Sequence, residues 1–146
     1  VMKSGVVQQI GAPQEVYDDP KNLFVAKFLG TPPINVFNGK VESEKLYIGG
    51  EAVLDVKGAP DGEVMVGVRP EGFIIDDYGP FHCKLSSVEV MGRDVSIVST
   101  NEASVNPIIR SIINADPATE TVSYALKPHK VFIFNKETEE RIYFEV

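Results

Sequence analysis

The sequence has no tryptophan, one cysteine and two histidines among its 146 residues. The single Cys83 cannot form a disulfide within the chain, which indicates a reducing compartment. His82 stands next to Cys83, and adjacent side chains on a strand point to opposite faces, so these two cannot chelate one metal ion side by side. His129 is far away in the sequence. These scarcities predict no metal site.

Long apolar runs and an excess of basic residues are also lacking. No apolar run approaches the ~20 residues of a membrane span, and no secretory leader opens the sequence. The chain has 14 Lys and Arg against 21 Asp and Glu, which gives a net charge of −7. Nucleic-acid binding and attraction to an anionic membrane surface both depend on basic residues, so the sequence predicts neither.

The motifs of a self-contained enzyme are absent as well. Nothing matches Gly-x4-Gly-Lys-[Ser/Thr], the loop that cradles phosphates, and there is no Gly-x-Ser-x-Gly nucleophile turn. The acidic pairs Asp18-Asp19 and Asp76-Asp77 fall in turn or cap contexts that explain them without catalysis. We therefore expect no catalytic residue and no bound cofactor in this chain.

The residues that are present begin with a hairpin pattern and a first helix. We expect a strand, a turn at Gly5 and a second, largely buried strand over Val6–Ile10. Pro13 suits the first position of a helix, where its missing N–H costs nothing, although Ala12 is a poor cap. A chain that starts inside a hairpin is expected to be part of a larger protein.

A second helix is predicted after Asp19, which can cap it, with Pro20 in its first turn. Its apolar residues repeat at i, i+1, i+4 and i+5, as expected of a face that packs against a neighbour. They are Phe24, Val25, Phe28 and Leu29. Gly30 and Pro32-Pro33 end the helix. We expect this stripe to pack on the strands that follow, or in part on a domain outside this chain.

From Val36 onward the pattern is one of short strands. Asn38-Gly39 and Gly49-Gly50 are typical of tight turns, and the apolar Val64–Val68 is predicted to be a central strand. The other predicted strands cover residues 40–42, 46–48, 51–56, 85–90, 95–98, 108–113, 121–126, 131–134 and 141–146. Strands of this length and spacing, after one or two helices, indicate a small β-barrel or sandwich.

Four residues are candidates for an interaction or structural site. Arg69 and Glu71 place two charges at the end of the apolar strand Val64–Val68. We interpret them as an ion pair that fixes the strand exit, and the alternative is a contact with a ligand or a second chain. Phe24 and Phe28 are the largest side chains of the helical stripe.

Three segments carry a resemblance to a known family. They are the run Gly5-Val-Val-Gln-Gln-Ile-Gly-Ala-Pro13 with the helices after it, Gly67-Val-Arg-Pro-Glu71, and Phe134-Asn-Lys-Glu-Thr-Glu-Glu-Arg-Ile142. Together they resemble the domain junction, a strand end and the closing hairpin in ATP-binding subunits of ABC importers of the maltose and multiple-sugar type. The sequence departs from the family at Ala12, Asn135 and Glu139, where Thr or Ser, Asp and Gly are usual.

The resemblance implies a mainly β fold with an OB-type small barrel built from two strand sets, the transport-associated (TOBE-type) regulatory domain. Residues 1–35 would be the tail of the nucleotide-binding domain and its helical connector, and residues 36–146 the regulatory domain. The ATP-binding loop and signature sequence lie upstream in that family. Mg-ATP would therefore belong to the parent protein and not to this chain.

The resemblance also implies a role and partners. The role is non-catalytic: regulation and dimerisation in a carbohydrate importer located in the cytoplasm, peripheral to the inner face of the cell membrane. The partners would be a second copy of the subunit, the membrane subunits through the missing domain, and a regulatory protein. The alternative is a small-ligand domain that senses oxyanions. An OB-type binder of single-stranded nucleic acid is disfavoured because both halves of the sequence are acidic.

Overall fold

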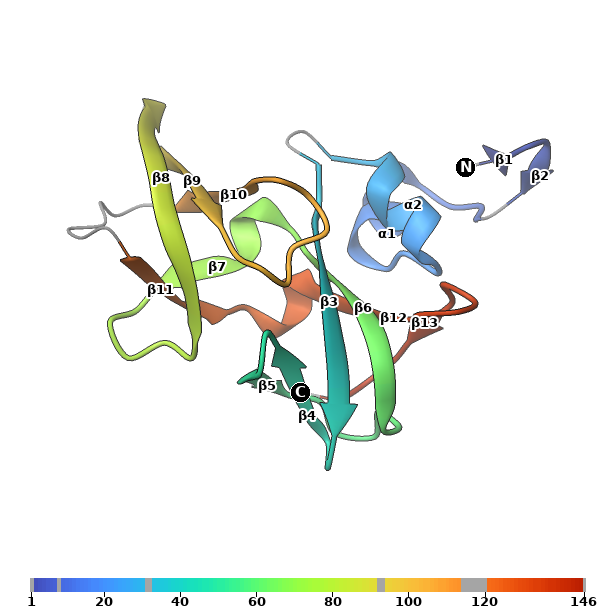
Figure 1. The fold of residues 1–146 in the computed structure, drawn as a ribbon. Coiled ribbons are helices and arrows are strands. Elements are labelled where there is room, and N and C mark those ends of the chain that lie inside the picture. Colours follow the sequence, from blue (N-terminus) through green and yellow to red (C-terminus); the bar gives the residue numbers. More distant parts are fainter. Residues whose placement is uncertain (1, 8, 31–32, 92–93, 114–120, 146) are drawn as a thin grey trace.

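The computed structural model describes residues 2–7, 9–30, 33–91, 94–113 and 121–145 (Figure 1). It is mainly β: a short N-terminal hairpin and two short helices lie beside a small barrel made from two sheets. The strand orders are β13-β12-β6-β3-β4-β5 in one sheet and β10-β9-β8-β11-β7 in the other. The predicted fold class is confirmed.

The second sheet is made of strands that are consecutive along the chain, whereas the first combines strands from before and after them. The first sheet contains β3 (Asn35–Glu42), β4 (Lys45–Ile48), β5 (Glu51–Asp55), β6 (Gly62–Val68), β12 (Val131–Asn135) and β13 (Arg141–Ile142). The second contains β7 (Phe73–Ile75), β8 (Phe81–Met91), β9 (Asp94–Thr100), β10 (Ile109–Ile113) and β11 (Thr121–Leu126). The predicted central strand is confirmed, since β6 lies between β12 and β3.

The barrel consists of two halves with the same topology. In the first half, β3, β4 and β5 form a meander, β6 pairs with β3, and the 3-10 turn η1 (Pro70–Gly72) leads to β7. In the second half, β8, β9 and β10 form the meander, β11 pairs with β8, and η2 (Pro128–Lys130) leads to β12. The last strand of each half pairs with the other half: β7 of the first half pairs with β11, and β12 of the second half pairs with β6.

The strand registers and turn hydrogen bonds repeat this relation. Gly67 is opposite Phe132 in the first sheet, as Ala125 is opposite Ile74 in the second. The Arg69 N–H donates to the Lys130 carbonyl at 3.0 Å, and the Lys127 N–H donates to the Gly72 carbonyl at 2.8 Å. Arg69 and Lys127 are thus equivalent positions in the two halves, and so are Phe132 and Ile74.

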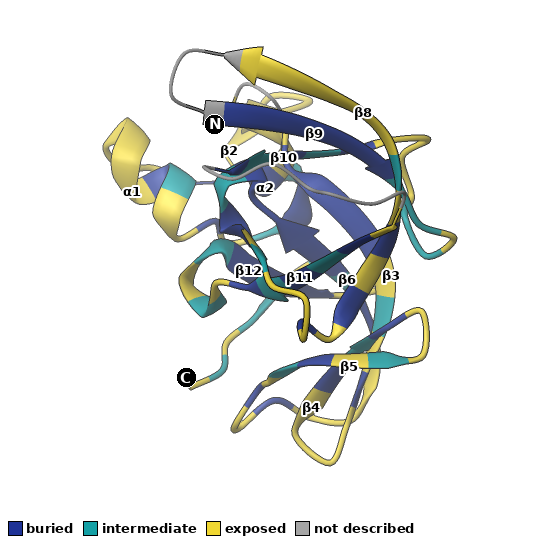
Figure 2. Ribbon diagram, turned by 90° about the vertical axis from the view of Figure 1, so that its left-hand side faces the viewer, coloured by how far each residue is buried: buried dark blue, intermediate teal, exposed yellow. Residues whose placement is uncertain are grey.

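The main core lies between the two sheets, and buried residues line β6 and β9 on its sides (Figure 2). Phe37 and Phe81 occupy equivalent positions in β3 and β8 and meet edge to face, with ring centroids 5.3 Å apart. Both rings are fully buried. Such pairs contribute about 0.5–1.5 kcal/mol beyond the burial of their area.

One buried amide joins the two sheets. The Asn35 Nδ2 donates to the carbonyls of Val68, at 3.2 Å, and Arg110, at 2.8 Å. Its Oδ1 accepts from the Arg110 N–H at 2.9 Å. The side chain of Asn35 therefore pairs with the backbone of β10 as a neighbouring strand would, and it satisfies polar groups that burial would otherwise leave without partners.

Two strand predictions were wrong in detail. Asn38-Gly39 lies inside β3, and the turn after that strand falls at Ser43 and Glu44, which both have positive φ. Gly39 is required by space: a Cβ there would lie 2.8 Å from the Tyr47 carbonyl oxygen and from Val66. The last strand was predicted over 141–146; among the described residues 141–145 β13 covers Arg141–Ile142, and residue 146 lies outside them.

The N-terminal hairpin differs from the prediction in burial. β1 (Met2–Lys3) and β2 (Val6–Val7) pair antiparallel across a turn at Ser4 and Gly5, both with positive φ, so the predicted hairpin is confirmed. Its apolar side chains are exposed, at 61% for Val6 and 87% for Ile10. The expected burial was therefore wrong for Val6, Val7 and Ile10, because the described part of the chain supplies no surface that covers them, whereas Gln9 is buried. The strand predicted over Val6–Ile10 is described only at Val6–Val7, and residue 8 lies outside the described residues.

The two helices are α1 (Pro13–Asp18) and α2 (Leu23–Phe28). Pro13 opens α1, and Ala12 makes no side-chain cap, as predicted. The predicted cap of the second helix was wrong: Asn22 accepts from the Val25 N–H at 2.9 Å, and Pro20 lies before the helix. The expected stripe was also wrong in part, since the buried residues of α2 are Leu23, Val25 and Ala26.

Candidate functional site: the joint between the helices and the barrel

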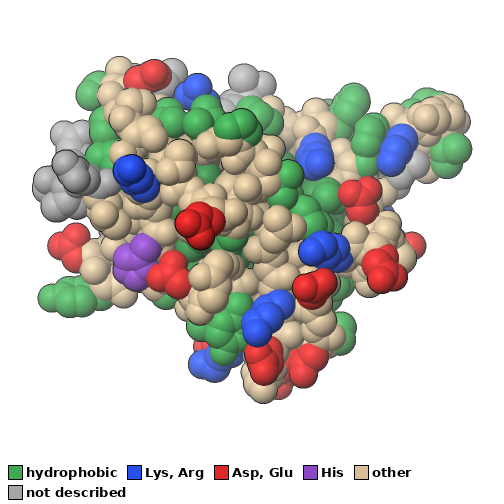
Figure 3. Space-filling model, viewed as in Figure 1, with side chains coloured by type: hydrophobic (Ala, Val, Ile, Leu, Met, Phe, Trp, Pro, Cys, Tyr) green, Lys and Arg blue, Asp and Glu red, His purple; other side chains and the backbone are tan. Residues whose placement is uncertain are grey.

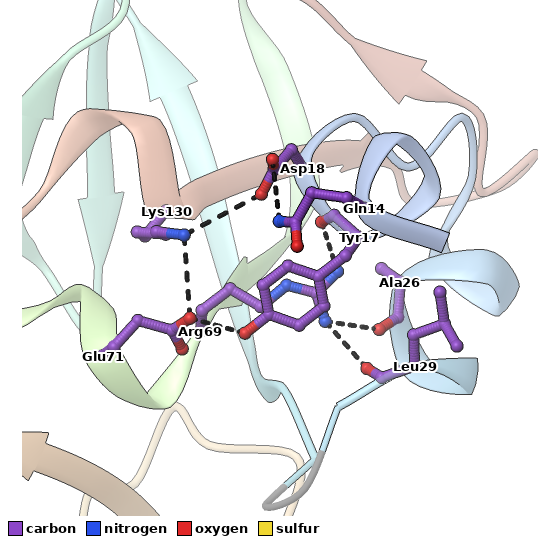
Figure 4. A network of polar contacts seen from close by, with 8 residues as sticks. All are labelled: Gln14, Tyr17, Asp18, Ala26, Leu29, Arg69, Glu71 and Lys130. Atoms are coloured by element: carbon purple, nitrogen blue, oxygen red, sulfur yellow. Dashed lines mark hydrogen bonds and ion pairs between the residues drawn. The ribbon is translucent and has the colours of Figure 1, made fainter. Parts of the chain in front are cut away.

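Arg69, at the end of β6, ties both helices to the barrel. Its side chain is fully buried, and Nη1 donates to the carbonyls of Ala26, at 2.9 Å, and Leu29, at 3.0 Å (Figure 4). Nη2 donates to the Tyr17 carbonyl at 2.8 Å. These carbonyls belong to the last turns of α2 and α1, where helix carbonyls lack partners and a cation is favoured. One guanidinium therefore caps two helices.

Aromatic rings enclose the same guanidinium. Its Cζ lies 4.0 Å from the centroid of the Tyr17 ring and 5.5 Å from that of Phe132. Burial lowers the pKa of Arg69, while Tyr17, Glu71 and Asp18 act in the opposite direction. A planar cation with several donors suits such a stacked, buried position better than a lysine would.

Glu71 lies in η1, two residues after Arg69, and holds the side chain of Tyr17. The Tyr17 hydroxyl donates to Glu71 Oε2 at 2.6 Å, and Lys130 Nζ lies 3.6 Å from the same oxygen (Figure 4). Burial and the hydrogen bond to Glu71 raise the pKa of Tyr17 to about 12. Burial by itself would raise the pKa of Glu71, but Tyr17, a backbone N–H, Lys130 and Arg69 together hold it below its usual range.

A second arginine fixes the segment between the helices. Arg141, in β13, donates from Nη1 to Asp19 Oδ1 at 3.0 Å and to the Pro20 carbonyl at 2.8 Å. Its guanidinium lies 4.6 Å from the centroid of Phe132, the ring that also faces Arg69. Gln9 completes the attachment, with Nε2 donating to the Asp19 carbonyl at 3.0 Å. The connector is thus held at several points along its length.

The structure brings two of the residues that the sequence singled out, Arg69 and Glu71, to the same tyrosine, in an arrangement that differs from the expected one. Arg69 and Glu71 both contact Tyr17, yet Arg69 bonds to carbonyls and Glu71 to Tyr17 and Lys130. The interpretation of a simple Arg69–Glu71 ion pair was therefore wrong. The reason is geometric, since Pro70 starts η1 and sends the two side chains toward different partners.

Phe24 and Phe28 lie on the outer side of α2, away from this joint. Phe28 is 59% exposed and Phe24 is half-buried, and their ring centroids are 6.1 Å apart. The Lys3 Nζ lies 5.5 Å from the centroid of the Phe24 ring. Whether these two side chains serve an interaction stays a prediction.

Sequence reasoning missed Tyr17, Lys130 and Arg141 as members of the joint. Each is more than 40 residues away from Arg69 in the sequence, and no local spacing relates them. One signal was available: the fragments Val68-Arg69-Pro70 and Leu126-Lys127-Pro128 repeat a strand end, a basic residue and a proline. That repeat could have revealed the two halves and placed Lys130 beside Arg69.

The sequence is similar to several known transport proteins. Over 159 residues it is 33% identical to the oligosaccharides import ATP-binding protein MsmX of Bacillus subtilis, covering 97% of this chain and 43% of that protein. It is 31% identical to the uncharacterized ABC transporter ATP-binding protein YcjV of Escherichia coli O157:H7, over 95% of this chain and 42% of that protein. The chain is a distant homologue of ABC importer ATP-binding proteins.

A third importer protein extends the substrate range of these relatives. The sn-glycerol-3-phosphate import ATP-binding protein UgpC of a Ruegeria species is 28% identical over 97% of this chain and 41% of its own length. No protein-family model matches the chain. The chain spans about two fifths of the length of these importer proteins and aligns with their C-terminal part.

An apolar hollow lies beside the connector of this importer homologue. It has a volume of about 430 Å³ and is lined mostly by apolar residues of the hairpin and both helices. Its walls include Met2, Val7, Ile10, Pro13, Val16 and Leu29. Within the described ranges, no group of three or more His, Cys, Asp or Glu residues could hold a metal ion. No helix there has the length and apolar character that a membrane span needs.

Proposed function

We propose that this chain is the non-catalytic regulatory part of the ATP-hydrolysing subunit of a carbohydrate ABC importer. In this role it pairs with a second copy of the subunit and couples their contact, and the binding of a regulatory protein, to transport. Residues 1–35 then join the nucleotide-binding domain to the barrel of residues 36–146. The assembled subunit works in the cytoplasm at the inner face of the membrane, where the missing domain meets the membrane subunits.

The joint at Arg69 is the observation that carries this proposal. A regulatory domain can follow the motion of an ATPase domain only if the segment that connects them is rigid. Three hydrogen bonds from one buried guanidinium fix the ends of α1 and α2, and Arg141 fixes the segment between them. A displacement applied to the connector is therefore passed to β6 and β12 with little loss.

The exposed apolar residues beside the hollow give independent support. Met2, Val6, Val7 and Ile10 are all more than half exposed within the first ten residues. Contiguous apolar surface of this kind marks a contact with another protein surface. The relatives are more than twice as long as this chain, which is consistent with an upstream domain seated here.

The experiment compares the complete ATP-binding subunit with a version that ends before residue 36. Sedimentation velocity measures pairing of the subunits without nucleotide, and isothermal titration measures Mg-ATP binding. We expect the truncated subunit to bind Mg-ATP while its pairing weakens at least tenfold. Equal pairing of the two versions would contradict the proposal, and so would tight binding of Mg-ATP to residues 1–146.

The oxyanion-sensing alternative has less support. An oxyanion site needs backbone N–H groups or basic side chains that converge on a hollow. Arg69 and Arg141 direct their Nη donors to backbone carbonyls and to Asp19. A rise in melting temperature with molybdate, tungstate or sulfate would favour this alternative over the regulatory role.

A further inference from the structure

The two halves of the barrel differ in how they are covered. In the first half, Arg69 is fully buried, and Phe132, at 2% exposure, packs in one cluster with Leu23 and Ala26 of α2. At the equivalent positions of the second half, Lys127 is exposed and Ile74 is 45% exposed. The same face is therefore covered by α2 in one half and open in the other.

An exposed aromatic side chain stands next to the open face. Tyr78, in the β7–β8 loop, is 96% exposed, and the neighbouring Asp76 and Asp77 are exposed as well. The loop is held in place, since Asp76 Oδ1 accepts from the Tyr78 N–H at 2.9 Å and the Asp76 carbonyl accepts from Gly79 N–H at 2.8 Å. Ile74, Asp76, Asp77 and Tyr78 are called the loop surface below.

Gly79 packs this loop tightly against the backbone of β11. A Cβ at Gly79 would lie 2.4 Å from the carbonyl carbon and oxygen of Tyr124, so only glycine fits. The backbone of the loop therefore holds Tyr78 at a fixed place on the barrel, and little backbone entropy is lost when a partner binds it. Exposed tyrosines in such positions are common anchors of protein interfaces.

The outer side of α2 has the opposite charge. Phe24, Phe28, Lys27 and Lys3 form a basic and aromatic surface, called the helix surface below, in which Lys3 lies over the Phe24 ring. Figure 3 shows hydrophobic and basic side chains close together at the upper right, over the hairpin and α2. It also shows a projecting hydrophobic side chain and an acidic one at the lower left, where Figure 1 places the β7–β8 loop.

We propose that the helix surface of one copy of this chain docks on the loop surface of a second copy. Phe24 and Phe28 then contact Ile74 and Tyr78 of the partner copy, while Lys27 and Lys3 face the partner's Asp76 and Asp77. In each copy α2 covers its own first half with one side and the partner's second half with the other. This contact rests on the proposed role in subunit pairing and assigns a surface to it.

Charge complementarity favours a second copy as the occupant. The chain has a net charge of −7, so two copies repel each other unless basic residues of one meet acidic residues of the other. The helix surface supplies such a basic patch next to the half-buried Phe24 ring and the exposed Phe28 ring. Each surface contributes only four side chains, far fewer than the 20–30 residues a side of a standard interface. We therefore expect weak association that decreases as salt rises.

Charge exchange tests the contact in the 146-residue chain by sedimentation velocity over a range of protein concentrations. We expect Lys27→Glu alone and Asp77→Lys alone each to weaken self-association about tenfold. The double variant should recover to within about threefold of the original, because the two charges attract again with reversed signs. Tyr78→Ser should weaken association at least tenfold. Lys57→Glu, an exposed charge reversal away from both surfaces, serves as the matched control.

Two results would overturn the docking contact. One is self-association that Lys27→Glu, Asp77→Lys and Tyr78→Ser leave unchanged, and the other is no self-association at millimolar protein concentration. The proposed pairing function is tested separately, on the complete subunit with and without residues 36–146. If pairing of the complete subunits depends on residues 36–146 but is unchanged by the charge reversals, the docking contact is refuted while the proposed pairing function stands.

Discussion

Replacing Arg69 by methionine tests the joint between the helices and the barrel. The change keeps a long side chain between Tyr17 and Phe132 but removes three hydrogen bonds to helix carbonyls. Bonds from a charged donor contribute about 1.5–3 kcal/mol each, so the gross loss is about 4.5–9 kcal/mol. The methionine variant also avoids the desolvation cost of a buried charge, which offsets part of this loss. The offset includes the cost of Arg69 Nε, which has no hydrogen-bond partner among the described residues. We expect a net loss of about 3 kcal/mol in the attachment of α1 and α2.

Hydrogen exchange measures this loss where it occurs. The amides of Val16 and Ala26 bond within the two helices and report on their opening. A loss of about 3 kcal/mol corresponds to roughly a hundredfold faster exchange at these amides if the helices open locally. Amides in the centre of β6 should change much less. Arg69→Lys should fall between the two, because it keeps the charge but not the fork of donors.

The pseudo-equivalent position provides the control. Lys127 occupies the place of Arg69 in the second half of the barrel but is exposed, so Lys127→Met should leave exchange at Val16 and Ala26 unchanged. If Arg69→Met and Lys127→Met behave alike, the reasoning about the joint is wrong. The same holds if Arg69→Met slows exchange in the helices.

Three further predictions concern single side chains. Asn35→Leu should lower the free energy of unfolding by about 2–4 kcal/mol in urea titrations, because it leaves the Arg110 N–H and carbonyl buried without this partner; a loss below about 0.5 kcal/mol would disprove the bridge. Burial raises the pKa of the Cys83 thiol to about 12. Ellman's reagent at pH 8 should therefore react with this thiol only as fast as the chain unfolds. Rapid reaction of the folded protein would contradict the burial of Cys83. The pKa of Glu71 is lowered from an ordinary value of 4.5, so the stability it contributes is present above that pH and lost as the pH falls through the lower, folded-state value; Glu71→Gln should flatten the loss of stability below pH 4.5, and an unchanged acid profile would refute this.

The sequence was sufficient for the strands and helices with strong local signals. The run Val64–Val68 was predicted to be a central strand, and Pro13 was predicted to open a helix; both are confirmed. Local rules failed at Asn38-Gly39, because glycine is needed there for the close approach of Tyr47 and Val66 and not for a turn. The spacing of residues contains no information on such an approach between strands.

The site was predictable only in part, for a related reason. Arg69 was conspicuous as a charge at the end of an apolar strand, but its partners Ala26 and Leu29 contribute backbone carbonyls that no residue type reveals. Arg141 and Asp19 are 122 residues apart and meet only because β13 adds to the edge of the first sheet. Tertiary contacts of this kind follow from topology, which local patterns leave open.

The exchange of last strands between the halves has a consequence for folding. Neither half can complete its sheet from its own residues, because β6 of the first half pairs with β12 of the second, and β11 of the second pairs with β7 of the first. Closure of the barrel thus requires contacts between residues more than 60 positions apart, such as Val68 with Val131, and non-local contacts of this kind slow folding. The barrel should therefore gain and lose its structure in one cooperative step, and a nascent chain should remain unable to close it until β12 has been synthesised.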